Sequence, residues 1–161
     1  MSRNHIKTAK NLSHTSKIAK DFLKEIKRGK TVKKTASVVG LSGDLGAGKT
    51  AFTQAMGKHL GIKRKMSSPT FVIIKRYKLK TPSKPHLNKE GVKFKTLFHL
   101  DAYRLKNEKE LLHLGWQEII ENPEHLVFIE WPENVAKVMP KNSKFISISH
   151  SKDRKRVFKW S

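Results

Sequence analysis

The segment Gly43 to Thr50 constrains the fold of this chain more than any other part of the sequence. Its residues, GDLGAGKT, fit the phosphate-binding pattern G-x-x-x-x-G-K-[ST]. Glycines allow successive backbone N–H groups to point into one concavity, where the N-terminus of a following helix adds its dipole. The apolar run 37–41 before the segment is typical of a buried strand, and apolar residues follow it at helical spacing. This context indicates a nucleoside triphosphate site in an α/β protein.

The residue types in this segment suggest a role for each position. Lys49 is placed to reach the β- and γ-phosphates, and the Thr50 hydroxyl is placed to bind Mg²⁺. The alternative is a glycine-rich turn with a solvated lysine, which the flanking strand and helix patterns disfavour. The candidate nucleotide-binding residues here are Gly43, Asp44, Leu45, Gly46, Ala47, Gly48, Lys49 and Thr50.

The length of 161 residues suits one domain. We therefore expect a single α/β domain over 1–161, a P-loop NTPase fold with a central, mainly parallel sheet flanked by helices and a flexible segment over 1–12. The absence of cysteine excludes disulfides and thiolate metal sites. The first residues lack the apolar stretch of a signal peptide, and no run approaches the roughly 18 apolar residues of a membrane span, so we expect a cytoplasmic protein.

The charge of the chain is extreme, since 35 Lys+Arg against 13 Asp+Glu give +22. Such a field attracts polyanions, although a solvated lysine-rich surface without a dedicated partner explains the composition equally well. Residues 78–95 contain six lysines and two prolines and are interpreted as a long basic loop between two strands, 71–77 and 96–100. This loop is a candidate contact surface.

Two acidic residues follow predicted strands. The run 125–129 predicts a buried strand that ends at Glu130, and the run 96–100 ends at Asp101. In open α/β sheets, ligands bind at the carboxyl ends of strands. Glu130 is therefore a candidate carboxylate for Mg²⁺ or its water shell. Asp101 is as consistent with a metal or water ligand as with a helix cap or surface ion pair.

Capping and periodicity predict the remaining elements. A helix is expected from Thr15 or Ser16 to near Gly29, and a short helix is expected between Asn107 and Gly115. Alternating residues over 144–149 and 156–160 predict a final hairpin.

Four motifs together resemble the TsaE (YjeE) family, small bacterial ATPases required for tRNA threonylcarbamoyladenosine biosynthesis. They are residues 42–50, 68–71, 99–105 and 129–133, in the order and approximate spacing of the family. The resemblance spans nearly the whole chain. It implies an ATPase that acts with the TsaD and TsaB proteins, which modify the adenosine beside the anticodon in tRNAs reading codons that begin with adenine.

The resemblance also implies roles at the phosphate end of the nucleotide. Thr50 and Glu130 would bind Mg²⁺, and Asp101 would serve the metal or the hydrolytic water. Lys49, Asp101 and Glu130 are thus the candidate catalytic residues, with ATP and Mg²⁺ as cofactors. Residues 68–70 would form a nucleotide-sensitive switch.

At the other end of the nucleotide, the resemblance implies a second group of residues. Trp131 would lie by the nucleotide, with Glu133 nearby, and Thr15 would lie beside the adenine. A basic residue near the final hairpin would also contact the nucleotide. This residue is either Arg154 or Arg156.

We expect slow ATP hydrolysis by the chain alone, because the sequence supplies no assured arginine finger. The protein partners would complete or gate the site, and contact with tRNA would be indirect or weakly electrostatic, with no membrane partner. One alternative is a small P-loop kinase with Asp101, Tyr103 and Arg104 holding the acceptor. Another is a basic RNA-binding protein with a vestigial nucleotide site, although Phe94 and Phe98 are the only aromatics interleaved with its basic loop, which is poor material for base stacking.

Overall fold

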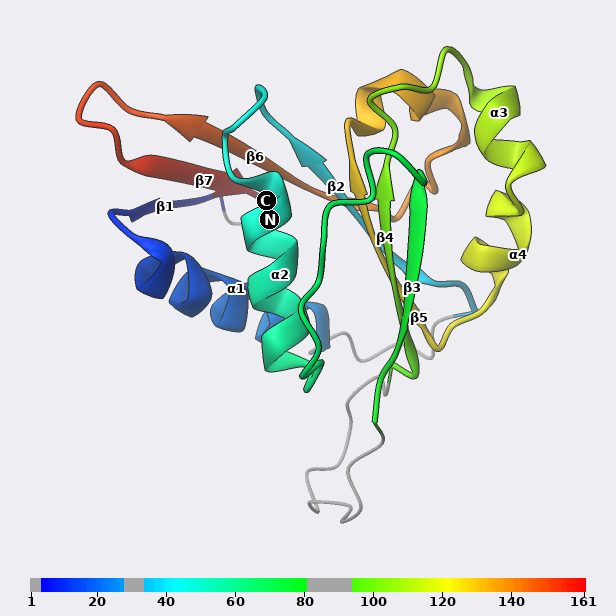
Figure 1. Ribbon diagram of the computed structural model, residues 1–161, viewed down its shortest axis with the longest axis horizontal. Helices are drawn as coiled ribbons and strands as arrows, with labels where there is room; N and C mark the ends of the chain where they lie inside the picture. Colours follow the sequence, from blue (N-terminus) through cyan, green and yellow to red (C-terminus); the bar gives the residue numbers. More distant parts are fainter. Residues whose placement is uncertain (1–3, 28–33, 81–93) are drawn as a thin grey trace.

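The computed structural model describes residues 4–27, 34–80 and 94–161. They form a seven-stranded sheet with helices on both faces (Figure 1). The elements in chain order are β1 (His5–Ala9), α1 (Leu12–Lys27), β2 (Ser37–Ser42), α2 (Lys49–His59), β3 (Ile74–Lys78), β4 (Thr96–Asp101), α3 (Glu108–His113), α4 (Trp116–Glu121), β5 (His125–Glu130), the 3-10 helix η1 (Pro132–Val138), β6 (Lys144–His150) and β7 (Arg156–Trp160).

The strand order is β1-β7-β6-β2-β5-β4-β3. The four central strands, β6, β2, β5 and β4, run parallel to one another. The outer pairs β1 with β7, β7 with β6, and β3 with β4 are antiparallel. The expected single α/β domain is confirmed, and its sheet is mixed, with a parallel centre and antiparallel margins.

Alternate residues of the central strands enter two separate cores. On β2, Val39 and Leu41 pack with α1 and α2, whereas Val38 packs with α3, α4 and η1. Burial of both faces explains why β2 and β5 are nearly continuous apolar runs. The helices on the two faces hold the parallel strands between them. The carboxyl ends of β2, β4 and β5 therefore lie at the same edge of the sheet.

The N-terminal segment differs from the predicted flexible segment over 1–12. Residues 5–9 form β1, which pairs antiparallel with β7, His5 opposite Trp160. The His5 ring stacks on Trp160 at 5.0 Å between centroids. Because β1 is half exposed, its sequence lacks an apolar run, and only its distant partner strand specifies it. Residues 1–3 lie outside the described residues.

Helix α1 begins one turn before the predicted start at Thr15 or Ser16. The Asn11 side chain accepts a hydrogen bond from the His14 backbone N–H at 2.9 Å, as an N-cap residue does. Thr15 is buried inside the helix, and its hydroxyl donates to the Asn11 carbonyl at 3.3 Å. The predicted end near Gly29 lies outside the described residues.

The strand predicted over 71–77 begins three residues later, at Ile74. Residues 70–72 form a turn, and Ile73 has a φ of 65° while its N–H donates to the Pro69 carbonyl at 2.6 Å. After β3, the Leu79 N–H donates to the Lys95 carbonyl at 2.8 Å, so the two strands approach each other beyond the ladder. Most of the predicted basic loop over 78–95 lies outside the described residues.

Two further predictions concern helices. Asn107 caps α3 as predicted, since its side chain accepts from the Lys109 and Glu110 N–H groups. Gly115, predicted to end that helix, stands between two helices and serves as the N-cap of α4 with a φ of 82°. In the part of the chain that the structure describes, no helix has the length and apolar character needed to cross a bilayer.

Candidate active site

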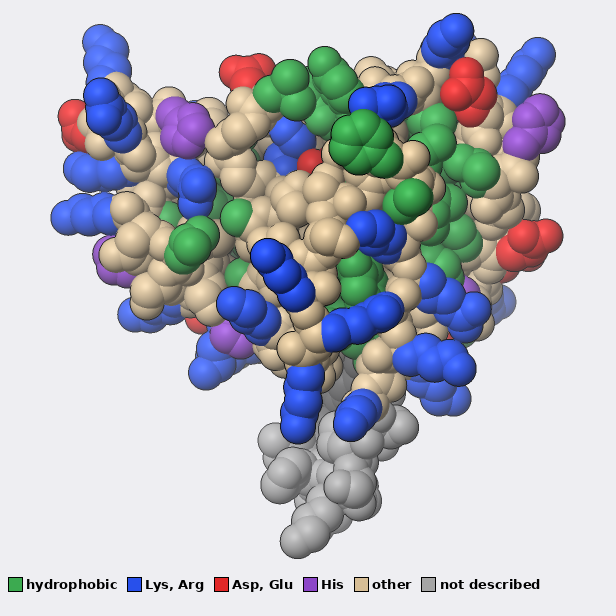
Figure 2. All heavy atoms as spheres, viewed as in Figure 1, with side chains coloured by type: hydrophobic (Ala, Val, Ile, Leu, Met, Phe, Trp, Pro, Cys, Tyr) green, Lys and Arg blue, Asp and Glu red, His purple; other side chains and the backbone are tan. Residues whose placement is uncertain are grey.

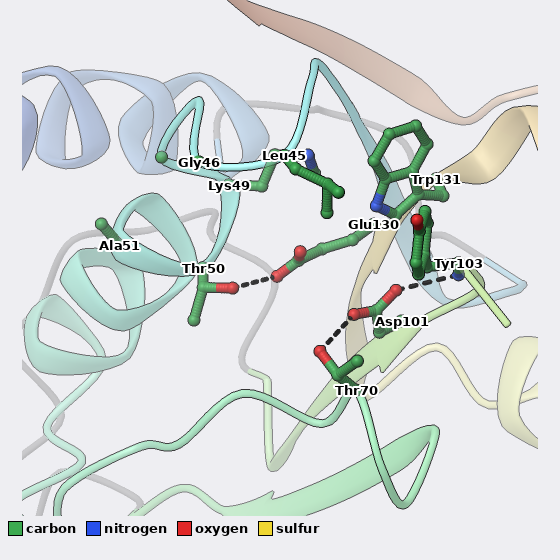
Figure 3. A pocket seen from close by; sticks show the side chains of 11 residues that line it. Leu45, Gly46, Lys49, Thr50, Ala51, Thr70, Asp101, Tyr103, Glu130 and Trp131 are labelled. Carbon is green, nitrogen blue, oxygen red and sulfur yellow. Dashed lines mark hydrogen bonds between the residues drawn. The ribbon is translucent and has the colours of Figure 1, made fainter.

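A pocket of about 250 Å³ lies where the carboxyl ends of β4 and β5 face the glycine loop and the start of α2 (Figure 3). Most of the predicted phosphate-end residues converge on it. The residues that line it are Leu45, Gly46, Gly48, Lys49, Thr50, Ala51, Thr70, Asp101, Tyr103, Glu130 and Trp131.

The glycine loop is built so tightly that two of its positions exclude a side chain. At Gly43, with a φ of 148°, an added Cβ would stand 2.2 Å from the Ile148 carbonyl oxygen. At Gly48, with a φ of 111°, it would stand 2.9 Å from Nε of Arg156. The final hairpin, which supplies both Ile148 and Arg156, therefore forms one wall of the loop.

Lys49 is the first residue of α2 and is only 4% exposed. Its ammonium donates to the carbonyls of Gly43 and Asp44. It also lies 4.4 Å from the ring centroid of Trp131, whose ring in turn lies 5.0 Å from that of Tyr103. The loop carbonyls and the two aromatic rings thus hold a buried cation at the pocket.

Glu130, the last residue of β5, is the carboxylate nearest the start of α2. Its Oε1 accepts a hydrogen bond from the Thr50 hydroxyl at 2.8 Å (Figure 3) and lies 2.8 Å from Nε2 of the fully buried His99. A hydroxyl and a carboxylate in contact suit Mg²⁺, which takes one or two protein ligands and completes its shell with phosphate oxygens and water.

In the part of the chain that the structure describes, no group of three or more His, Asp or Glu side chains could hold a metal by itself. Thr50 and Glu130 would therefore bind Mg²⁺ only together with the phosphates of a nucleotide. The assignment of Thr50 and Glu130 to Mg²⁺ stays a prediction from the sequence.

Asp101 ends β4 directly opposite Glu130 in the parallel register. Its Oδ2 accepts from the Thr70 hydroxyl at 2.7 Å, and its Oδ1 accepts from the Tyr103 N–H at 2.9 Å (Figure 3). The Thr70 hydroxyl also lies 2.6 Å from that of Ser68. Asp101 therefore connects the segment predicted as a switch to the sheet beside Glu130.

Six of the predicted site residues are not among those that line this pocket: Thr15, Gly43, Asp44, Ala47, Glu133 and Arg154. Thr15 is enclosed within α1. Glu133 lies in η1, where its carboxylate accepts a bond from the Ser42 hydroxyl at 3.3 Å. Trp131, two residues before Glu133, lines the pocket and has a φ of 58°.

Both arginines of the hairpin line a second pocket of about 590 Å³, beside the start of α1. Arg154 occupies the hairpin turn with a φ of 56°. The Arg156 side chain lies where a Cβ added to Gly48 would stand, so Arg156 is the arginine of this pair that borders the glycine loop. The other residues that line the second pocket are Ala9, Lys10, Asn11, Leu12, Ser13 and His150.

The sequence analysis gave no role to His99, although the structure places it against Glu130. The period of two along a strand would have identified it, because His99 lies two residues before Asp101 and must share its face of the sheet. A histidine inside an otherwise apolar strand was the available signal.

The fold and the glycine loop between β2 and α2 define a P-loop α/β protein. The chain belongs to the TsaE family: a family model described as "Threonylcarbamoyl adenosine biosynthesis protein TsaE" matches residues 9–158.

Similar proteins support this assignment. The tRNA threonylcarbamoyladenosine biosynthesis protein TsaE of Bacillus subtilis is 36% identical over 123 residues, which cover 76% of this chain and 68% of the relative. The protein of the same name from Treponema pallidum is 35% identical over 70% of this chain and 72% of its own. A crystal structure of Bacillus subtilis YdiB superposes with a TM-score of 0.68 at 29% identity, over 99% of this chain and 86% of that one.

Proposed function

We propose that this chain is the Mg²⁺-dependent ATPase of the bacterial tRNA threonylcarbamoyladenosine system. The observation that carries the proposal is the convergence of Lys49, Thr50 and Glu130 on one pocket at the carboxyl end of the parallel strands. Family membership supplies the biological context. Like the chain's relatives, it would support the modification of tRNA rather than transfer the threonylcarbamoyl group itself.

In this proposal each residue has a distinct task. The N–H groups of the glycine loop and the Lys49 ammonium bind the β- and γ-phosphates. Thr50 and Glu130 would hold Mg²⁺, which would supply positive charge to neutralise the charge that develops on the phosphates. Asp101 orients water at the metal or at the γ-phosphate. Trp131 covers the Lys49 side of the pocket and limits the access of bulk water.

The nucleoside would extend from this pocket toward the second pocket. Arg156 lines the second pocket and lies beside Gly48 of the glycine loop, so it is the favoured choice between the two hairpin arginines. Thr15 would contribute indirectly, since its hydroxyl is bonded to the backbone of Asn11 at the rim of the second pocket.

Hydrolysis by the isolated chain would be slow. No arginine is among the residues that line the first pocket within the described residues, and Arg104 instead lies over the ring of Phe71, 4.6 Å from its centroid. An arginine finger contributes roughly 10³ to 10⁵ in rate in other P-loop enzymes. A partner protein would therefore complete the site or reposition a residue of this chain.

The rim of the pocket is suited to such a protein partner. Leu45 and Phe71 are 68% and 84% exposed, and Val72 and Tyr103 are also exposed. An apolar, partly aromatic rim is typical of a protein interface. We propose that TsaD and TsaB are the partners and that the complex forms in the cytoplasm.

The test is steady-state ATP hydrolysis with Mg²⁺, with and without TsaD and TsaB, for the wild-type chain, Lys49→Ala and Glu130→Ala. Partner-stimulated hydrolysis is expected for the wild-type chain. Lys49→Ala should lose nucleotide affinity, whereas Glu130→Ala should bind nucleotide but lose Mg²⁺-dependent turnover. Wild-type binding and hydrolysis in both variants would contradict the assignment, and partner-independent phosphate transfer to an added acceptor would instead favour a kinase.

A further inference from the structure

A strongly basic surface lies away from the nucleotide pocket. The sequence contains no Asp or Glu between Asp44 and Glu90. Lys and Arg side chains gather over the lower centre of the molecule in Figure 2, where Figure 1 shows the end of α2 and strand β3. We call this surface the basic face, and its exposed cations are Lys58, Lys63, Arg64, Lys65, Arg76, Lys78 and Lys80.

The basic face is held together by contacts between its three segments. Arg64, in the loop after α2, donates to the Arg76 carbonyl on β3 at 3.1 Å and lies 4.6 Å from the ring centroid of Tyr77. Gln54 of α2 donates to the Met66 carbonyl at 2.7 Å. The loop is thus bound to α2 on one side and to β3 on the other, so its cations have a defined arrangement.

The cations of the basic face lack acidic partners among residues 4–27, 34–80 and 94–161. Within the described residues no carboxylate forms an ion pair with any cation of the basic face. Elsewhere on the surface, Lys7, Lys95 and Lys155 each pair with an acidic residue. Uncompensated like charges repel one another, and a polyanion would relieve that repulsion and release counterions when it binds.

The face also contains a hollow. A pocket of about 410 Å³ has an apolar floor of Ile62 and Met66 and a rim that includes Lys58, Lys63 and Lys65. Along β3, Arg76 and Lys78 share one side of the strand because side chains alternate with a period of two. The cations therefore border a groove and continue along a strand rather than standing singly.

The chemistry of the face favours a phosphodiester backbone over a protein or a bilayer. Of the large hydrophobic side chains exposed among the described residues, none belongs to α2, to the loop 60–66 or to β3. Protein interfaces depend on buried apolar or aromatic anchors, and membrane-surface helices insert apolar side chains. Contact with a nucleic acid backbone needs cations alone.

We propose that the basic face binds the phosphate backbone of RNA without reading its sequence. The site lies on α2, the loop 60–66 and β3, and it includes Lys78 and Lys80 at the start of the predicted basic loop over 78–95. The proposal goes beyond the ATPase function and does not depend on it, since the cations concerned contribute nothing to the nucleotide pocket.

The test measures binding of the full chain to a fluorescent tRNA transcript by anisotropy at several salt concentrations. The basic-face variant carries Lys58→Gln, Lys63→Gln, Lys65→Gln and Lys78→Gln. Arg64 is retained because it holds the loop in place. A control variant with the same loss of four charges carries substitutions of exposed lysines on other surfaces: Lys20→Gln, Lys109→Gln, Lys137→Gln and Lys141→Gln.

We expect the basic-face variant to bind tRNA at least ~10-fold more weakly near 0.1 M salt. The plot of log K against log salt concentration should also become less steep, by up to about 3 to 4 in the magnitude of its slope, because each phosphate contact contributes ~0.9. The control variant should stay near the wild-type values. If both variants lose the same tRNA affinity, binding depends only on the net charge of the protein, and the proposal is overturned. Unchanged tRNA binding combined with lost association to TsaD or TsaB would assign the face to an acidic protein and also overturn it.

Two measurements distinguish a failure of the RNA-binding proposal from a failure of the ATPase proposal. The thermal unfolding temperature shows whether each variant is folded, and ATP hydrolysis in the same samples should be unchanged in both. Failure to bind tRNA in a chain that still hydrolyses ATP would reject the RNA surface alone.

Discussion

His99 on β4 lies with its Nε2 2.8 Å from Oε1 of Glu130 on β5, the same oxygen that accepts the Thr50 hydroxyl. Both the imidazole and the carboxylate are buried. Glu130 is therefore fixed from two sides, by a sheet neighbour and by the first turn of α2. His99 is a positioning residue for the carboxylate rather than a group that contacts the nucleotide.

Replacing His99 by Leu should leave Glu130 buried without its sheet partner, at a cost of ~1 to 3 kcal/mol. We expect a roughly tenfold higher Mg²⁺ concentration for half-maximal turnover, with little change in nucleotide affinity. His99→Gln, which can restore a donor, should recover part of the loss. Magnesium titrations of ATP hydrolysis check this, and an unaltered Mg²⁺ dependence in His99→Leu would refute the positioning role.

Arg156 and Arg154 should differ in their effect on nucleotide affinity. The Nε atom of Arg156 is buried without a hydrogen-bond partner within the described residues, and this side chain contacts Gly48. Arg156→Gln should weaken ADP binding roughly tenfold, as expected for losing a hydrogen bond to a charged group. Arg154→Gln should change it little. Isothermal titration with Mg²⁺-ADP compares the two, and a larger effect at Arg154 would reverse the assignment.

Two glycines of the loop should respond differently to alanine. Both have positive φ, but the space beside Gly46 is open, whereas a Cβ at Gly48 would meet Arg156. Gly46→Ala should cost only the backbone term of ~1 to 2 kcal/mol, and Gly48→Ala should cost more because the hairpin must also shift. Thermal unfolding of the nucleotide-free chain distinguishes the two variants. Equal destabilisation would show that Arg156 can move away from an added Cβ at no cost in stability.

Loss of the Thr70 hydroxyl should loosen the turn before β3. Thr70→Val removes the 2.7 Å hydrogen bond to Asp101, which ties this turn to the sheet. The amides of Val72 and Ile73, which bond to the Pro69 carbonyl, should then exchange hydrogen about fivefold faster, as expected for losing ~1 kcal/mol of local stability. Ser68→Ala is the matched control because it preserves the bond to Asp101. Exchange mass spectrometry that finds no difference between the two variants would contradict the coupling.

The contact between β1 and α1 should make a small, pH-dependent contribution to stability. The hydrogen bond from Lys7 lowers the pKa of the Asp21 carboxyl below its usual value. A depressed folded-state pKa stabilises the fold above the ordinary pKa of Asp, and this contribution disappears as the pH falls through the folded value. Because both side chains are about one-third exposed, the gain is at most ~0.5 kcal/mol.

Lys7→Gln should therefore lower the unfolding temperature slightly at pH 7 and by a smaller amount near pH 3, below the ordinary pKa of Asp. Added salt should reduce the difference at pH 7, since exposed ion pairs are screened. Unfolding curves at both pH values measure it. A difference as large at pH 3 as at pH 7 would show that Lys7 acts through packing instead.

The parts of the fold that could be predicted are those with local signals. The strands ending at Glu130 and Asp101 were evident because burial on both faces produces continuous apolar runs. The cap at Asn107 was evident because its side chain satisfies N–H groups two and three residues later. The glycine loop combined both kinds of signal, so its position between β2 and α2 could be predicted from the sequence.

The parts that could not be predicted depend on distant contacts. Strand β1 is specified by β7, far along the chain, and its own residues are too exposed to form a pattern. Residues 71–73 are rich in β-strand formers, yet the turn that ends at Ile73 overrides that preference through its bond to Pro69. Thr15 and Glu133 were assigned from motif order, which does not report the direction of a side chain.

The pairing of β1 with β7 has a consequence for the order of events during synthesis. His5 emerges from the ribosome among the earliest residues of this sequence, whereas its partner Trp160 emerges among the last. Until then the N-terminal strand has no edge to join, and the arginine that borders the glycine loop has not been made. The wall beside the glycine loop is therefore assembled late, and a nascent chain would hold the loop without the hairpin that shapes it.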